Sequence, residues 1–286
     1  MPFLINKTFN LIEFIYCDII LIEKVIYMNE IIFSIIIPFV GTILGAGCVF
    51  VVKGPMKSSV QRAFSGFAAG VMMAAAIWSL ILPSFDAASD MGKLSFIPVV
   101  AGLWLGFFFL MLLDKVVPHI HIDSNETEGP KCNLKKSTMT ALAVALHNLP
   151  EGMAVGIVLA SSQNDPNNVP ITMAIALAIG IAIQNFPEGA IISLPLRACG
   201  MKKSKTFILG VLSGIVEPIG ALITLLLAGL IAPAMPYLLS FAAGAMIYVV
   251  VEELIPEMTE GKHSHVGTIF FAIGFSLMMI LDIILG

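Results

Sequence analysis

Eight apolar stretches, each about 20 residues or longer, run through this chain, and they restrict its fold more than any other feature. About 20 apolar residues are needed for an α-helix to cross the hydrocarbon core of a bilayer, and such a helix satisfies its own backbone hydrogen bonds in lipid. The chain is 58% hydrophobic and 12% charged, whereas soluble domains carry about 25% charged residues. We therefore predict an all-α integral membrane protein with eight transmembrane helices, at about residues 31–52, 64–84, 95–117, 138–160, 170–195, 206–230, 235–256 and 265–285.

Residues 1–30 precede these stretches, and residues 31–286 are predicted to form a single eight-span domain. Charged side chains such as Glu13 and Lys24 interrupt the first 30 residues and would be costly at the centre of a bilayer. The segment also lacks the basic start and the cleavage site of a signal peptide. We expect an N-terminal extension of unknown role, either an amphipathic surface helix or the product of a mis-assigned start upstream of Met28.

The basic residues predict the orientation of the chain, because Lys and Arg concentrate in loops on the cytoplasmic side. They follow the first, third, fifth and seventh predicted spans, whereas the opposite set of loops contains only Lys93. We therefore expect a multi-pass protein of the plasma membrane, a cell inner membrane, with both termini outside the cytoplasm. The long loop at about residues 118–137 would lie in the cytoplasm.

Composition excludes two further features. The net charge of −4 and the scattered basic residues argue against nucleic acid as a partner. The expected partner of the apolar surface is the lipid bilayer. No CxxC spacing occurs, and two cysteines fall in loops expected in the cytoplasm, so we expect no disulfide framework among Cys17, Cys48, Cys132 and Cys199.

Three predicted spans carry ionisable side chains at membrane depth, where each such group suggests a function. The fourth span contains HNLPEG at residues 147–152, the fifth contains QNFPEG at 184–189, and the sixth contains Glu217 before Pro218. A proline inside a helix leaves a backbone carbonyl without its hydrogen bond. Lipid tolerates this only beside protein or a polar cavity, where transporters place their ion sites.

The spacing within the two motifs predicts shared helix faces. The first residue of each motif and its glutamate are four residues apart and lie on one face, as in His147 with Glu151 and Gln184 with Glu188. The asparagine after each first residue is offset by about 100°, and could serve a neighbouring position, as in Asn148 and Asn185. The pattern predicts two adjoining cation sites.

The charge count in these spans indicates what they bind. Glu151, Glu188 and Glu217 share the fourth to sixth spans with no Lys or Arg. Because an isolated carboxylate costs at least about 2.5–3.5 kcal/mol at the bilayer centre, these groups either take up protons or bind cations. One imidazole with carboxylates, amide oxygens and a thioether suits Zn²⁺, Fe²⁺, Mn²⁺ or Cd²⁺ better than Na⁺ or K⁺. The set also differs from the closed Cys/His tetrahedron of structural zinc, which fits an ion that leaves again.

At these residues the sequence resembles the ZIP family of divalent metal transporters, in particular its prokaryotic GufA-like branch. Besides the two motifs, the match includes GFAAGVMMAAAIWSLILPS at 66–84, GIVEPIGA at 214–221 and FAAGAMIYVVVEELIPE at 241–257. It covers about residues 31–286. The resemblance implies an eight-helix fold whose first three and last three spans form an inverted repeat around a central helix pair. It implies a carrier rather than an enzyme, with no prosthetic group, that imports Zn²⁺ or a similar divalent ion by alternating access.

The resemblance also carries a binuclear metal site over to this chain, residue by residue. The first metal position would use His147, Glu151, Gln184 and Glu188, with Met72 close by. The second would use Asn148, Glu151, Asn185, Glu188 and Glu217, so that the two motif glutamates bridge both metals. Some relatives have aspartate at the position of Asn185 and histidine at that of Glu252, which leaves metal preference and the occupancy of the second position open.

Other matching positions suggest a path for the ion. Ser79 and Asp86 look like pathway residues towards the outer mouth. Glu252 and Glu253 lie near the end of the seventh span and fit either a pathway role or an interfacial anchoring role. In the cytoplasmic loop, His119 and His121 are expected to be solvated, with receipt of imported ions as the alternative role.

Two functions of other classes remain as alternatives. Paired Glu and His side chains also build di-iron enzymes, but those use Glu-x-x-His, whereas the order here is His-x-x-x-Glu. The HExxH motif of a zinc protease is missing from the sequence as well. A receptor that binds metal without moving it is the second alternative. The homodimer that the family often forms, and a channel-like mechanism, are also left open.

Overall fold

The computed structural model describes residues 2–116, 136–228 and 234–285, apart from Lys53, Pro55, Asp165, Asn167 and Lys262. Every regular element within these ranges is a helix. The elements in chain order are α1 (Pro2–Ala46), η1 (Gly47–Phe50), α2 (Ser58–Ala75), η2 (Ala76–Ile81), α3 (Leu82–Ala87), η3 (Ser89–Ser95), α4 (Phe96–Val116), α5 (Lys136–Asn164), α6 (Ile171–Ala198), α7 (Lys203–Gly214), α8 (Val216–Ala228), α9 (Met235–Val249), η5 (Val250–Leu254), α10 (Ile255–Thr259) and α11 (Val266–Leu285).

Eight helical segments of the described residues are long and apolar enough to cross a bilayer, which confirms the predicted span count. They run over Leu21–Phe50, Ser58–Ala87, Ser89–Val116, Val144–Asn164, Ile171–Ala198, Lys203–Leu227, Met235–Thr259 and Val266–Leu285. Each overlaps one predicted span. Two of them differ in detail from the prediction, because the first begins earlier and the sixth is divided at Ile215 between α7 and α8.

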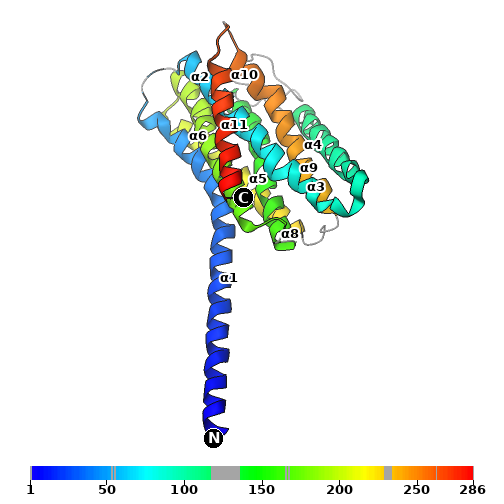
Figure 1. Cartoon of the computed structure of the whole chain (residues 1–286). Helices are drawn as coiled ribbons and strands as arrows, with labels where there is room; N and C mark the ends of the chain where they lie inside the picture. The colour runs from blue at the N-terminus through cyan, green and yellow to red at the C-terminus, as the bar shows by residue number, and fades with distance from the viewer. Residues whose placement is uncertain are drawn as a thin grey trace.

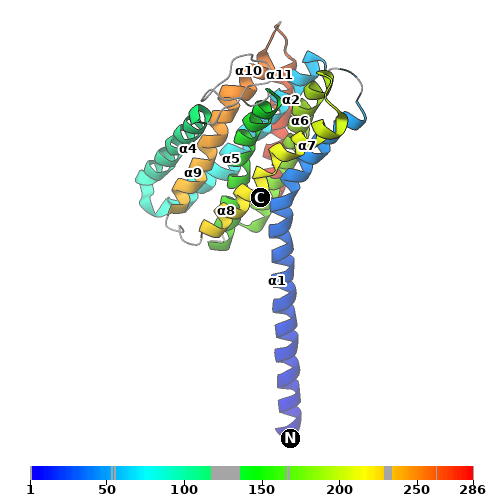
Figure 2. The ribbon, with the colours of Figure 1, turned by 180° about the vertical axis from the view of Figure 1, so that it is seen from behind.

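Helix α1 is far longer than a bilayer requires. Its 45 residues reach about 67 Å at about 1.5 Å per residue, roughly twice the hydrocarbon thickness. It passes through residue 30 without a break, so the extension and the first span are one helix. The N-terminal part continues beyond the ends of the other helices (Figures 1 and 2). The role of residues 1–30 stays a prediction.

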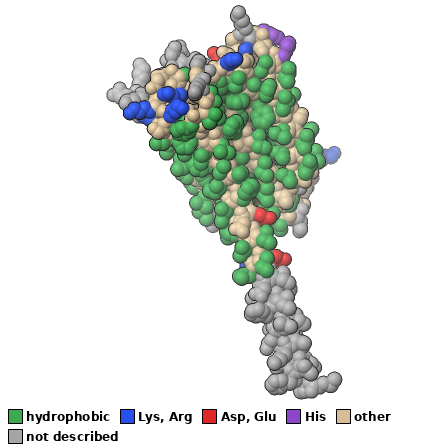
Figure 3. Space-filling view, turned by 90° about the vertical axis from the view of Figure 1, so that its left-hand side faces the viewer, with side chains coloured by type: hydrophobic (Ala, Val, Ile, Leu, Met, Phe, Trp, Pro, Cys, Tyr) green, Lys and Arg blue, Asp and Glu red, His purple; other side chains and the backbone are tan. Residues whose placement is uncertain are grey.

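The outer surface divides into an apolar flank and a basic end. Large apolar side chains such as Trp104, Leu105, Phe108 and Leu112 on α4 are exposed, and apolar side chains cover the flank seen in Figure 3. Lys and Arg side chains gather mainly at one end of the helix bundle in that view. This distribution matches a multi-pass membrane protein, while the side on which the termini lie stays a prediction.

The helices pack as four close pairs: α1 with α6, α2 with α11, α4 with α9, and α5 with α8. In every pair one helix presents two glycines spaced four residues apart, where a Cβ atom would overlap the partner helix. Small residues of this kind let membrane helices approach closely. The glycine pairs are Gly41 and Gly45 on α1, Gly66 and Gly70 on α2, Gly102 and Gly106 on α4, and Gly152 and Gly156 on α5.

The pairing fits the inverted repeat that the resemblance implies. Exchanging the first three spans with the last three, and the fourth with the fifth, maps α1·α6 onto α8·α5 and α2·α11 onto α9·α4. The sequence FAAG occurs at residues 67–70 of α2 and again at 241–244 of α9. Each of these two helices continues into a π-helical segment, η2 or η5, with a proline shortly after it. Helices α5 and α6 contact one another and form the central pair.

Candidate functional site

The two motifs lie on the central pair, HNLPEG on α5 and QNFPEG on α6. Both helices continue through their motif prolines, Pro150 and Pro187. The polar side chains of both motifs other than His147 are buried, and those of Glu151, Gln184 and Asn185 are completely so. Polar groups of this type are enclosed only where they bond to one another or to a ligand.

The sixth span is broken at the site. Helix α7 ends at Gly214, and α8 begins at Val216, which places Glu217 in the first turn of α8. Pro218 has no N–H to donate, which favours the break. Because the N-terminus of a helix carries partial positive charge, a carboxylate is stabilised in this first turn. Half-helices that end beside a polar site are typical of transporters.

The glycine after each motif glutamate brings a further helix to the site. A Cβ atom on Gly152 would overlap the backbone of Glu217, and one on Gly189 would overlap the carbonyl oxygen of Thr42. Their lack of a side chain lets α8 lie against α5 and α1 lie against α6 at the level of the motifs. Four helices therefore meet there.

A chain of hydrogen bonds joins the buried carboxylates through amides. Gln184 Nε2 donates to Glu151 Oε1, and also to Asn185 Oδ1 at 2.8 Å. Asn185 Nδ2 donates to Glu217 Oε2 at 2.8 Å and to the carbonyl oxygen of Pro38 at 3.3 Å. Neutral amides thus separate Glu151 from Glu217.

Glu217 has donors on both carboxylate oxygens. Oε1 accepts from Thr42 Oγ1 at 2.9 Å and from Asn148 Nδ2 at 3.0 Å, while Oε2 accepts from Asn185. Asn148 Nδ2 also reaches the carbonyl oxygen of Ser213 at 3.3 Å. These bonds tie α1, α5, α6 and α8 together around one carboxylate.

Lone-pair atoms without hydrogen bonds are concentrated in the two motifs. Among the described residues, eight buried side-chain nitrogen or oxygen atoms lack a hydrogen-bond partner. Five of them belong to the motifs: His147 Nε2, Asn148 Oδ1, Glu151 Oε2, Gln184 Oε1 and Glu188 Oε2. All five are atoms that can bind a cation.

His147 extends this group towards the seventh span. His147 Nε2 lies in close contact with Glu253 Oε1, and both side chains are 12% exposed. Glu188 is buried, and its Oε2 has no hydrogen-bond partner. The contact of His147 therefore links the α5 motif to η5.

The carboxylates do not yet converge on a single point. Across the described residues, no group of three His, Cys, Asp or Glu side chains is placed to hold one ion. The reason is visible in the hydrogen bonds, because the amide of Gln184 lies against Glu151 and that of Asn185 lies against Glu217. An ion would have to replace an amide donor.

The remaining predicted residues lie in three different environments. Met72 is completely buried in the apolar core, and Ser79 donates to Asp282 Oδ1 at 2.8 Å. Asp86 and Glu252 are exposed. The loop residues His119 and His121 fall outside the described part of the chain.

Two buried polar residues that accept from or donate to predicted residues were not anticipated from the sequence. Asp282 is an acidic residue in an apolar final span, 7% exposed, with Oδ2 unpartnered. The rule that drew attention to Glu217 applies to it equally. Thr42 gave no signal, because a threonine in a membrane helix satisfies its hydroxyl locally in many cases.

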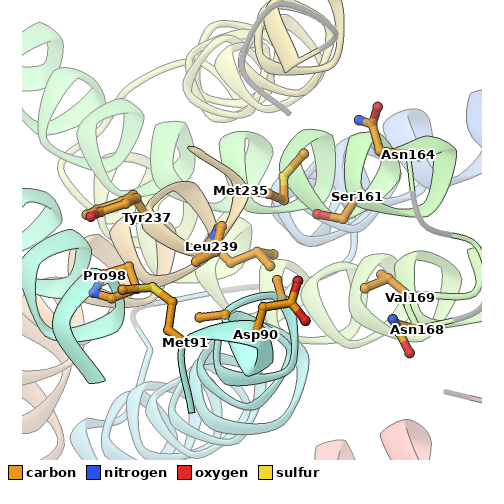
Figure 4. A pocket seen from close by; sticks show the side chains of 13 residues that line it. Asp90, Met91, Pro98, Ser161, Asn164, Asn168, Val169, Met235, Tyr237 and Leu239 are labelled. Atoms are coloured by element: carbon orange, nitrogen blue, oxygen red, sulfur yellow. The ribbon is translucent and has the colours of Figure 1, made fainter. Parts of the chain in front are cut away.

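The described cavity of 440 Å³ is not the motif site. Figure 4 shows Asp90, Met91 and Leu239 on one side of it and Ser161 and Asn168 on the other. None of the predicted metal ligands lines it. The motif residues instead lie in a closed, hydrogen-bonded core.

The comparisons with known proteins agree with this geometry. The family model described as ZIP zinc transporter matches residues 133–282, which include both motifs and Glu217. The chain belongs to the ZIP family. It is thus a member of a transporter family and not an enzyme, and the resemblance stated from its motifs is confirmed.

Similar proteins come from bacteria and vertebrates. The zinc transporter ZIPB of Bordetella bronchiseptica is 38% identical over 252 residues, which cover 87% of this chain and 79% of that protein. The zinc transporter GufA of Myxococcus xanthus is 33% identical over 250 residues, 86% of this chain and 96% of that protein. The zinc transporter ZIP11 of Homo sapiens is 31% identical over an alignment of 323 residues. That alignment covers 86% of this chain and 94% of that protein.

Proposed function

We propose that this ZIP protein carries divalent metal ions into the cytoplasm, principally Zn²⁺ and also Cd²⁺, Fe²⁺ or Mn²⁺. The main support is the cluster of four buried oxygen atoms without hydrogen bonds on the two motifs, together with His147 Nε2, which contacts only Glu253 Oε1. Each buried acceptor without a partner costs about 1–3 kcal/mol, and more when charged. A cation would satisfy several of these atoms at once. The relatives named as zinc transporters favour Zn²⁺.

The transported ion would occupy the first metal position, between α5 and α6. A half-turn of the Gln184 amide would withdraw Nε2 from Glu151 and present the unpartnered Oε1 instead. Glu151 Oε2 and Glu188 Oε2 would supply negative charge. An imidazole, carboxylates and an amide oxygen suit Zn²⁺ and related metals. The full ligand set is His147, Glu151, Gln184 and Glu188, with Met72 beside it.

A second metal position is bounded by Asn148, Asn185 and Glu217, next to the first. Glu151 and Glu188 would bridge the two positions if both were filled. Glu217 now accepts hydrogen bonds from both asparagine side chains. A second ion would have to displace them.

We place the path of the ion along the two π-helical spans. Ser79 on η2 and Asp86 on α3 would lie towards the outside, where the carboxylate of Asp86 attracts cations. Glu253 on η5 contacts His147 and would receive the ion on its way inward, with Glu252 beside it. Alternating access around the broken sixth span would expose the site to each side in turn.

Purified full-length protein in sealed liposomes tests the proposal. Zn²⁺ or Cd²⁺ added outside is expected to reach a chelating dye inside. Glu188→Ala should abolish this flux, because it removes a buried ligand carboxylate. Glu23→Gln is the matched control, since that carboxylate is exposed on α1 and should leave the flux unchanged.

The outcome separates a carrier from a metal receptor. Sealed liposomes of the unaltered protein that pass neither Zn²⁺ nor Cd²⁺ would refute the proposed function. Flux that persists in Glu188→Ala would instead refute the site. Uptake that rises linearly with metal, without saturation, would identify a channel rather than a carrier.

A further inference from the structure

We infer that Thr42 and Asn185 keep the second metal position closed, so that a single ion occupies the site. The inference rests on the proposed function and concerns the number of ions that the site holds. It makes Thr42 on α1 a positioning residue that acts through Glu217, and Asn185 the residue that determines whether a second ion binds.

Glu217 differs from the other two carboxylates in its hydrogen bonds. Glu151 and Glu188 each have one buried oxygen without a partner, whereas both oxygens of Glu217 have donors. Three donors reach it from three helices, at 2.9 Å from Thr42, 3.0 Å from Asn148 and 2.8 Å from Asn185. Of the carboxylates next to the second position, only Glu217 belongs to that position alone, and it has no oxygen left without a donor.

The environment of Glu217 stabilises the carboxylate without a metal. All three donors are neutral, and Glu217 itself is completely buried in the first turn of α8. Hydrogen bonds to a charged group are stronger than neutral ones, and the helix N-terminus adds partial positive charge. A second ion would have to break these bonds, and it would have to share Glu151 and Glu188 with the first ion. Apart from Glu217, its only unshared ligands would be the amide oxygens of two asparagines.

The packing fixes Thr42 in its place. Gly189 lets the backbone of Thr42 lie directly against α6, and Gly214 leaves room for its side chain beside Glu217. Thr42 and Glu217 occupy corresponding places, because each lies against the glycine of one motif. One of these places supplies a carboxylate and the other a hydroxyl. The pair holds one negative charge. With Glu151 and Glu188 the site has three, fewer than the four positive charges of two divalent ions.

Asn185 gives the sharpest test. Its amide donates to Glu217 and accepts from Gln184. Asn185→Asp keeps the acceptor for Gln184 but sets a second carboxylate against Glu217 in place of the donor. Two carboxylates so close cannot both stay charged without a cation between them. The variant should therefore bind an ion that the unaltered protein does not.

Cadmium counting measures this directly. Full-length protein in detergent is dialysed against Cd²⁺, and bound metal is measured per chain. Glu151→Ala/Glu188→Ala serves as the reference, because it retains ions held elsewhere, including any on the loop histidines. Relative to it, we expect one ion in the unaltered protein and two in Asn185→Asp.

Uptake by Thr42 variants tests the positioning role, and it decides the matter even if Asn185→Asp does not fold. Thr42→Val keeps the shape but removes the donor, so Glu217 turns towards cations. We expect KM and the maximal rate both to fall by at least about tenfold, the scale of one hydrogen bond to a charged group. Thr42→Ser restores the hydroxyl and should restore both values. A merely structural role would lower the maximal rate alone.

The results distinguish the inference from the function it rests on. Two ions in the unaltered protein, one ion in Asn185→Asp, or an unchanged KM in Thr42→Val would overturn the inference while transport stands. An unaltered protein that neither binds Cd²⁺ nor transports it would overturn both.

Discussion

Gly214→Ala tests how tightly the hydrogen bond between Thr42 and Glu217 is enclosed. Gly214 is the last residue of α7, directly before the break in the sixth span. A Cβ atom there would lie 2.8 Å from Thr42 Cγ2 and 3.0 Å from Glu217 Oε1. The added methyl group would therefore press on both partners of the bond at once.

The size of the effect follows from the overlap. The contact with Thr42 would be about 0.6 Å inside the 3.4 Å at which ordinary van der Waals contact begins. Thr42 has little room to retreat, because the glycines of α1 hold its backbone against α6. Overpacking of this kind costs about 1–3 kcal/mol, which corresponds to a factor of about 5 to 150 in an equilibrium.

Two measurements on full-length protein follow the consequence. We expect the maximal rate of Zn²⁺ uptake in liposomes to fall at least about fivefold, and the thermal unfolding midpoint in detergent to drop by several degrees. Gly47→Ala is the control, since a Cβ there meets nothing within 4 Å. A Gly214→Ala protein with the rate and midpoint of the control would refute the reasoning.

Four further predictions concern the site, the path and the fold. In steady-state uptake measurements, His147→Gln should raise KM for Zn²⁺, because it removes a predicted ligand. Glu253→Gln should lower the maximal rate more than it changes KM. Asp282→Asn should raise KM more than Ser79→Ala does, since it removes a buried charge and not only one hydrogen bond of about 0.5–1.5 kcal/mol; equal effects would contradict this order. Gly106→Ala should lower the unfolding midpoint and leave KM unchanged, because its Cβ would overlap the backbone of Phe241 on α9 and would touch no motif residue.

The spans were predictable because bilayer thickness sets their length and apolar composition. The internal break of the sixth span was not anticipated, although Gly214 and Pro218 frame it in the sequence. A hydropathy pattern reports only how apolar a stretch of residues is, and the residues on both sides of this break are equally part of one apolar stretch. The continuity of α1 was also not anticipated, since residues 21–30 lie in the same helix as the first span.

The site was predictable to the level of shared helix faces and no further. Spacing placed His147 with Glu151 and Gln184 with Glu188, and the structure brings the polar residues of both motifs and Glu217 into one buried cluster. Thr42 and Asp282 reach their partners across helix crossings that join segments 175 and 203 residues apart. Such contacts depend on which helix faces pack against one another, and the residues next to Thr42 or Asp282 in the sequence do not show this.

The repeated fold supports an unequal site. Each motif glycine admits one neighbouring helix, so the two halves of the repeat contribute in the same way to the backbone arrangement. The side chains differ, because the α5 and α8 half supplies His147, Glu151 and Glu217, whereas the α6 and α1 half supplies Gln184, Glu188 and Thr42. A carrier has to release its ion as well as bind it, and binding that is too strong slows release. Replacing an imidazole by an amide and a carboxylate by a hydroxyl in one half lowers the charge and the ligand strength there. The same backbone geometry used twice can therefore enclose an ion from both sides while holding it firmly from one.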